Sequence, residues 1–174
     1  MIVLDTNVLS ELARPEPDAA VLAWIAAQRR AELCTTAVSE AELAYGLALL
    51  PKGRRRDALA QAVARLLGEG LGGRVLAFDR AAATAFGEFA ARRRGAGRPV
   101  ATAETQIAAI ARARGAALLA TRDTGGFQGC GVRLVNPWGP DAERPDPGVV
   151  QKVPFPGRPS HLIGRKTANW RNGR

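Results

Sequence analysis

The sequence predicts an α/β fold with three layers, in which helices cover both faces of a central, mostly parallel sheet of five strands. Short uncharged apolar runs, typical of strands buried on both faces, alternate along residues 1–138 with longer segments of helical periodicity. Two helices often separate consecutive strands, which gives the chain the length that a parallel crossover needs. With 174 residues, 47% of them hydrophobic, the chain can form one domain with a sizeable core.

The first half of the chain is expected to contain two strands and four helices. Residues 1–4 are apolar throughout and predict the first strand, and residues 33–36 predict the second. Asp18 is suited to cap a helix, because its side chain can accept hydrogen bonds from the unpaired amides of the first turn. The remaining helices are expected over residues 8–13, 39–50 and 54–67, and the apolar face of the capped helix is expected to comprise Val21, Leu22 and Ile25.

The second half is expected to add three strands, at residues 75–78, 117–120 and 132–135, and two helices, at 79–94 and 102–114. Asp79 precedes three alanines after one arginine and is favoured as a helix cap. Gly115 is suited to end the last long helix. The glycine-rich segment 68–73 lacks the spacing and the Lys-Ser/Thr pair of a phosphate-binding loop, so a plain connector is expected there.

The composition changes after Asn136-Pro137-Trp138. Residues 139–174 are rich in proline and glycine, show little periodicity and carry seven basic and three acidic side chains. We therefore expect one folded domain over residues 1–138 and a basic, mostly disordered tail over 139–174. The net charge of +9 fits a polyanionic partner, but the excess of arginine over lysine (22 to 3) also fits compositional bias.

Several classes of protein and site are excluded or disfavoured. No run of 18 uncharged apolar residues predicts a membrane span, and the N-terminus lacks the pattern of a signal peptide, so a cytoplasmic location is expected. Cys34 and Cys130 form no CxxC motif and are expected to be unreactive thiols. The only histidine, His161, lies in the tail, which excludes histidine-based catalysis in the domain and leaves carboxylates as the candidate groups.

Four acidic side chains stand where a site would form. Asp5 and Asp123 follow the first and fourth strands, and sites in parallel α/β sheets form outside the carboxyl ends of the strands. Glu42 is either a site residue or the partner of Ser39 in a capping box. Glu104 is either a site residue or an acid in a first helical turn, where the helix dipole favours it.

Convergence of these carboxylates would be costly without a counter-charge. At an effective dielectric constant of about 20, two like charges 4 Å apart repel by roughly 4 kcal/mol. Such a cluster either binds protons or holds a cation, and carboxylate oxygens suit hard cations such as Mg²⁺ and Mn²⁺.

Seven short motifs follow one another along residues 1–138. They are Leu-Asp-Thr-Asn-Val-Leu-Ser-Glu-Leu at 4–12, Ser-Glu-Ala-Glu-Leu-Ala-Tyr-Gly at 39–46, Leu-Pro-Lys-Gly-Arg-Arg-Arg at 50–56, Gly-Arg-Pro-Val at 97–100, Gln-Ile-Ala-Ala-Ile-Ala at 106–111, Leu-Ala-Thr-Arg-Asp with Phe127 at 119–127, and Asn-Pro-Trp at 136–138. Their order and spacing resemble the PIN-domain family, especially the VapC-type ribonuclease toxins of type II toxin–antitoxin systems.

The resemblance implies a PIN-like fold and an endoribonuclease that depends on Mg²⁺ or Mn²⁺. Carried over by position, the catalytic and metal-binding acids are Asp5, Glu42, Glu104 and Asp123. The polar residues that support them are Thr6, Asn7 and Thr121. It also implies RNA as the substrate, a small antitoxin protein as a partner, and a homodimer.

Basic residues near these motifs are candidates for contact with the RNA backbone. Arg98 and Arg122 lie closest in sequence to the expected site, whereas the triplets 54–56 and 92–94 are weaker candidates. Cations at a helix C-terminus, as at 92–94, are also favoured by the helix dipole alone.

Two positions depart from the family pattern. The third acid is normally aspartate and is Glu104 here, and Gly126 stands where related proteins often carry an acid before the final phenylalanine. The longer side chain changes the reach of the carboxylate, and Mg²⁺ demands near-ideal geometry. The alternative to a nuclease is therefore a PIN-like RNA- or protein-binding module whose catalysis is weakened or lost through Glu104.

Overall fold

A parallel five-stranded sheet forms the centre of the computed structural model, which describes residues 1–98, 101–139 and 142. All four strand pairs are parallel, so the expected α/β fold is confirmed. The spatial order of the strands is β3-β2-β1-β4-β5. The strands are β1 (Ile2–Leu4), β2 (Leu33–Thr36), β3 (Val75–Leu76), β4 (Leu118–Ala120) and β5 (Arg133–Val135).

The strand order reverses next to the central strand β1. The chain passes outward from β1 to β2 and β3, then returns to place β4 on the other side of β1 and β5 beyond it. Ile2 is paired with Leu33 of β2 and with Leu118 of β4. The crevice at such a reversal, outside the carboxyl ends of the strands, is where open α/β sheets bind ligands. Here that place lies just after Leu4 and Ala120.

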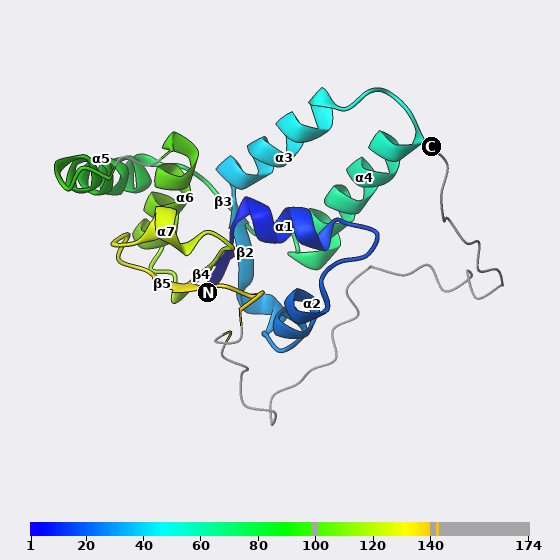
Figure 1. Cartoon of the computed structure of the whole chain (residues 1–174), viewed down its shortest axis with the longest axis horizontal. Helices are drawn as coiled ribbons and strands as arrows, with labels where there is room; N and C mark the ends of the chain where they lie inside the picture. Colours follow the sequence, from blue (N-terminus) through cyan, green and yellow to red (C-terminus); the bar gives the residue numbers. More distant parts are fainter. Residues whose placement is uncertain (99–100, 140–141, 143–174) are drawn as a thin grey trace, which may run out of the picture.

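Helices cover both faces of the sheet (Figure 1). One face carries α1 (Thr6–Leu12), α2 (Ala19–Ala26), α3 (Ala37–Leu49) and α4 (Arg54–Arg65), and the other carries α5 (Arg80–Gly95), α6 (Thr102–Ala113) and α7 (Thr124–Phe127). Two short turns, η1 (Arg30–Glu32) and the π-helical η2 (Leu66–Gly70), complete the described elements.

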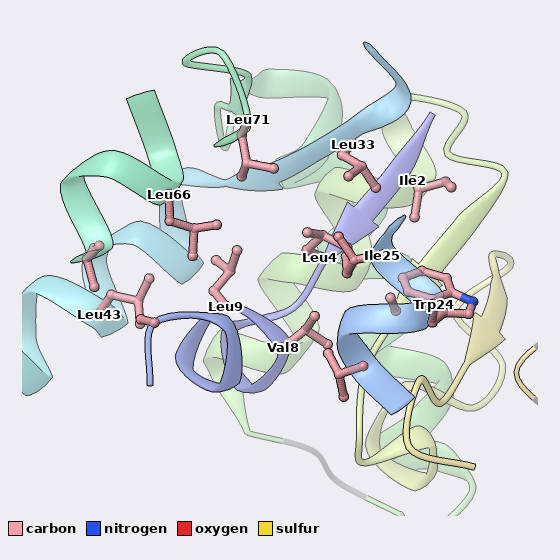
Figure 2. Close-up of a cluster of buried hydrophobic side chains, with 14 residues drawn as sticks. Ile2, Leu4, Val8, Leu9, Trp24, Ile25, Leu33, Leu43, Leu66 and Leu71 are labelled. Carbon is pink, nitrogen blue, oxygen red and sulfur yellow. The ribbon is translucent and has the colours of Figure 1, made fainter. Parts of the chain in front are cut away.

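Alternation along the central strand divides the core in two. Ile2 and Leu4 join the cluster beneath α1–α4, whereas Val3, between them, joins the cluster beneath α5–α7. Figure 2 shows the first cluster, where Val8 and Leu9 of α1 meet the sheet and Trp24 of α2. Burial on both faces explains why the strands read as continuous apolar runs.

The second cluster packs α5 and α6 closely against the sheet. Phe89, Ile107 and Leu119 are almost completely buried there, with Phe127 from α7. Small residues of α6, including Ala108 and Ala111, are also buried and allow the helix backbone to approach its neighbours. This packing fixes the first turn of α6, which carries Glu104.

The helix that carries Glu42 begins earlier than expected. Its cap is Thr36, whose hydroxyl oxygen accepts a hydrogen bond from the Ser39 amide at 3.0 Å, so α3 starts at Ala37 rather than at 39. The alternative prediction, a capping box between Ser39 and Glu42, is therefore wrong, since Ser39 lies inside the helix. The last residue of a strand doubles as a helix cap here, which strand and helix periodicity alone do not reveal.

Other boundaries differ for reasons of packing. The glycine-rich connector begins as the helical turn η2, and Leu71 just after it is fully buried. On α2, Trp24 rather than Leu22 is buried with Val21 and Ile25, and Leu22 is 37% exposed. The third strand is only two residues long.

Helix α1 spans 6–12 instead of 8–13 because Asp5 caps it, and α4 ends at Arg65 instead of 67, whereas the other expected helix caps are confirmed. Asp18 and Asp79 cap α2 and α5, each through a hydrogen bond from a first-turn amide. Gly115 follows α6 with φ of 63°, the left-handed conformation that glycine adopts easily. Among the described residues, no helix has the length and apolar character to cross a membrane. The expected tail, with His161 and Trp170, lies outside the described residues apart from Gly139 and Ala142.

Candidate functional site

Asp5 lies at the carboxyl end of the central strand, and only 5% of its surface is exposed. It caps α1, since its Oδ1 accepts a hydrogen bond from the Thr6 amide at 2.7 Å. Its Oδ2 accepts hydrogen bonds from Asn7 Nδ2 and from the Thr121 hydroxyl, both at 2.8 Å. Three donors therefore hold the buried carboxylate in one orientation.

The same polar side chains connect the ends of β1 and β4. Asn7 Nδ2 also donates to Thr121 Oγ1 at 3.0 Å, and Asn7 Oδ1 accepts from the Arg122 amide at 3.1 Å. Thr121 Oγ1 accepts a further bond from the Asp123 amide at 3.2 Å. The loop after β4, which carries Asp123, is thus tied to the segment after β1, which carries Asp5.

The pKa of Asp5 lies above the ordinary value for an aspartate. Burial raises its pKa to about 6, the hydrogen bonds from Thr121 and the Thr6 amide oppose this rise, and the negative charges of Glu42 and Glu104 add to it. Acids on two other elements, α3 and α6, therefore act on the Asp5 carboxylate. A bound cation would relieve the repulsion among these three negative charges.

Glu42 is placed by a contact between two helices. It is exposed on α3, and its Oε2 accepts a hydrogen bond from the Thr6 hydroxyl at 2.5 Å. Helices α1 and α3 pack against one another, and this packing holds the Thr6 hydroxyl and the Glu42 carboxylate close together. Glu42 thereby lies next to the residue that follows Asp5 in the chain.

Glu104 lies in the first turn of α6 and is partly buried. Burial raises its pKa, repulsion from Asp123 and Glu42 adds to the rise, and the positive charge of Arg93 opposes it. Asp123 caps the short helix α7, with its Oδ1 accepting from the Gly125 amide at 3.0 Å. All four predicted acids therefore surround the same edge of the sheet.

The two positions that depart from the family pattern touch one another. A Cβ atom placed on Gly126 would lie 2.6 Å from Glu104 Oε2 and 3.4 Å from its Oε1. The carboxylate of Glu104 therefore fills the space that a side chain at 126 would need. Both departures were visible in the sequence, but their contact was not, since nothing local links α6 to the loop after β4.

The donor chemistry fits a hard divalent cation, although the side chains do not yet converge on one point. In the described part of the chain, no group of three Asp, Glu, His or Cys side chains is arranged to hold a metal ion. Glu42 is bonded to Thr6, Asp123 to α7, and Glu104 rests against Gly126. A cation would have to draw these flexible carboxylates toward the fixed Asp5.

The two predicted RNA-contacting arginines are placed differently. Arg98 lines a cavity at the C-terminal end of α5 together with Arg92 and Arg93. Arg122 instead stacks on Trp138, with its guanidinium carbon 4.5 Å from the ring centroid. From sequence, Arg93 was a weaker candidate than Arg98, because a position at a helix C-terminus is enough to favour a positive charge. The sequence did not reveal that Arg93 lies near Glu104.

An open parallel sheet with acids gathered at its strand-order reversal defines a class of α/β protein with an acidic site at the carboxyl ends of its strands. The PIN domain is the family whose model matches this chain, over residues 2–129. The chain belongs to the PIN-domain family, as the motifs indicated.

The relatives include proteins with toxin and ribonuclease names. The VapC ribonuclease Y4jK of Sinorhizobium fredii is 46% identical in an alignment of 143 residues that covers 80% of this chain and 99% of that protein. The plasmid stability protein StbB of Pseudomonas syringae pv. tomato is 46% identical over 138 residues, which are 79% of this chain and 99% of StbB. The crystal structure of FitAcB from Neisseria gonorrhoeae is similar with a TM-score of 0.72 and 36% identity, covering 79% of this chain and 99% of that one.

Proposed function

We propose that this protein is a metal-dependent endoribonuclease of the VapC type, which acts in the cytoplasm and is neutralised by an antitoxin. The observation that carries the proposal is the buried Asp5, held by three hydrogen-bond donors and repelled by Glu42 and Glu104 at the reversal of the sheet. The 46% identity to a protein named VapC ribonuclease supports the same assignment.

Mg²⁺ or Mn²⁺ would supply an activated water molecule and offset the negative charge of the transition state during phosphodiester hydrolysis. Asp5 and Glu104 are proposed as its main ligands. Glu42 and Asp123 would complete the set of oxygen donors or orient the attacking water. Without a cation these carboxylates repel one another, and a bound hard cation would replace that repulsion with coordination. Binding of such a cation is therefore favoured.

The polar residues around Asp5 would act by positioning it. Thr121 and Asn7 donate to one carboxylate oxygen and the Thr6 amide to the other, which restricts rotation of the side chain. Partners of this kind typically contribute 10–100-fold to metal affinity or activity. Thr6 would also hold Glu42 through its hydroxyl.

A partner protein is proposed on the basis of the relatives and of one exposed helix face. The curated relatives include a toxin, FitB of Neisseria gonorrhoeae, at 36% identity. Tyr45 and Leu49 of α3 are each 67% exposed, an apolar surface that an antitoxin or a second copy of the chain would cover. A monomeric mass in light scattering that Tyr45→Ser leaves unchanged would contradict the second copy.

The nuclease activity is tested by incubating the purified chain with single-stranded RNA and Mg²⁺ or Mn²⁺. We expect cleavage that EDTA stops and that Asp5→Asn lowers by at least about 100-fold, because the buried ligand is lost. Asp57→Asn, the same substitution on the exposed surface of α4, is the matched control and should retain activity. Undiminished cleavage in EDTA would refute metal dependence.

A further inference from the structure

A cavity lined by arginines lies beside the proposed catalytic carboxylates. Its volume is about 400 Å³, and it is formed by the C-terminal end of α5 and the segment after α7. Arg92, Arg93 and Arg98 contribute three positive charges, and the other lining residues carry no charge: Phe89, Ala96, Gln128 and Gly129. A concave site of this composition is suited to an anion.

Two of these arginines are held in place by the loop that faces them. Arg93 Nη1 donates to the Gln128 carbonyl at 3.3 Å, and Arg92 Nη2 donates to the Gly129 carbonyl at 3.4 Å. Arg93 Nε, in contrast, is buried and has no hydrogen-bond partner within the described structure. A buried donor without a partner is uncommon and costs free energy, so a ligand that accepts a hydrogen bond would satisfy it.

The cavity is adjacent to the proposed catalytic carboxylates. Arg93 is close enough to Glu104 for its positive charge to act on that carboxyl group. An anion bound by Arg93 would therefore lie next to the carboxylates and not at a remote surface. A strand of RNA offers anions at regular intervals, so one phosphate can lie at the carboxylates while a neighbouring phosphate occupies the cavity.

We propose that the cavity formed by Arg92, Arg93 and Arg98 binds a backbone phosphate of single-stranded RNA, adjacent to the phosphate at the carboxylates. The inference rests on the proposed ribonuclease function for its choice of ligand. Guanidinium groups bind phosphate through charge-assisted, often bidentate hydrogen bonds, which a cluster of three provides. The contact positions the RNA without reading its sequence.

The test measures binding of a fluorescent single-stranded RNA to the Asp5→Asn chain by anisotropy across a range of salt concentrations. Arg93→Gln and Arg98→Gln should each weaken binding by about tenfold. Each should also reduce the slope of log K against log salt by about 0.7, because one phosphate contact is lost. Arg94→Gln, which removes an exposed charge from the same helix outside the cavity, is the matched control and should change both values much less.

The outcomes separate this proposal from the nuclease assignment. Unchanged RNA binding by both variants, with cleavage by the unmodified chain, would overturn the phosphate site and leave the function standing. Arginine-dependent binding without any cleavage would support the site and refute the nuclease. Unchanged RNA binding with weakened binding of an acidic peptide, probed with poly-glutamate, would overturn the proposal in favour of a protein ligand. Arg98 is exposed, so its variant reports on the site even if Arg93→Gln impairs folding.

Discussion

Asp5 is a charged residue at the end of a strand that is otherwise completely apolar. Its placement at the carboxyl end of β1 could be predicted, because the sequence changes there from Ile-Val-Leu to polar residues. The donors that hold it could be named only by resemblance to the family, since Thr121 lies 116 residues away. Contacts of that separation are invisible to local sequence patterns.

The raised pKa of Asp5 makes stability depend on pH in a defined direction. Between pH 3.8 and about 6 the folded chain retains a proton that the unfolded chain has released. The free energy of unfolding of the metal-free protein should therefore fall as the pH rises through this range, by about 3 kcal/mol from this group. Asp5→Asn does not titrate at position 5, so its stability relative to the unmodified chain should rise by most of that amount between pH 4 and pH 7.

Urea unfolding in EDTA at pH 4 and pH 7 measures this difference, and Asp57→Asn provides the exposed control. A stability difference between Asp5→Asn and the unmodified chain that does not change with pH would contradict the burial of an ionisable Asp5. Mg²⁺ added at pH 7 should stabilise the unmodified chain more than Asp5→Asn, because only the former keeps the carboxylate.

Glu104 and Gly126 contact one another, and the Glu104 carboxylate occupies the space that a side chain at position 126 would need. Gly126 has no positive φ, so Gly126→Ala strains no backbone, but its Cβ would displace the Glu104 carboxylate. We expect Mn²⁺ affinity, measured by calorimetry, to fall by about tenfold, as for loss of an orienting contact. In a Glu104→Asp background the shorter carboxylate leaves that space, and Gly126→Ala should then have little effect.

A double-mutant cycle gives the coupling between these two positions directly. Gly87→Ala on α5 is the matched control, because nothing lies within 4 Å of its added Cβ. Additive effects of the two substitutions would contradict the pairing. Glu104→Asp also addresses the alternative function: a nuclease gained from an inactive parent would identify the parent as a binding module.

At the scale of elements, periodicity predicted most of the described fold. Strand β2 has the expected bounds, α5 is shifted by one residue at both ends, and α6 ends one residue early. The two helices carry clear signals: Asp79 caps the start of α5, and Gly115 follows the end of α6. The agreement indicates that local preference and tertiary packing favour the same structure there.

The elements that differed are those whose ends are decided by tertiary contacts. Thr36, the last residue of β2, caps α3. The first residues of the glycine-rich segment 68–73 belong to η2, and Leu71, which follows η2, is buried. The turn α7 is held by Asp123 and the buried Phe127, neither of which signals a helix by periodicity. Since α7 brings Gly126 to Glu104, the part of the site least predictable from sequence is also the part that departs from the family.

At the scale of the whole molecule, topology explains how distant residues meet. The carboxyl ends of β1 and β4 are neighbours because the strand order reverses between them, and α3 and α6 reach the same edge from opposite faces. The four acids could be selected from the sequence because they follow strands or begin helices. Their rotamers and the arginine cavity beside them could not, since these depend on packing between α5, α6 and α7.

We propose that the folding unit ends near residue 142 and that residues 143–174 are not needed for its stability. Within the described structure, both buried clusters are formed by residues up to Ala142, and Trp138 and Ala142 pack against the first cluster. Trp138 also supports the Arg122 guanidinium. The similarity to StbB extends over 138 residues of this chain and covers almost all of StbB.

A chain truncated after Ala142 should therefore keep its melting temperature within about 2 °C, because no described core contact is removed. A chain truncated after Val135 loses the Trp138 packing and should be less stable by about 3 kcal/mol, since loss of a partly buried tryptophan leaves apolar surface of the first cluster uncovered. Calorimetric melting of the three lengths compares them directly. A large loss of stability in the chain that ends at Ala142 would mean that residues 143–174 contribute to the stability of the domain. The domain boundary would then lie further toward the C-terminus.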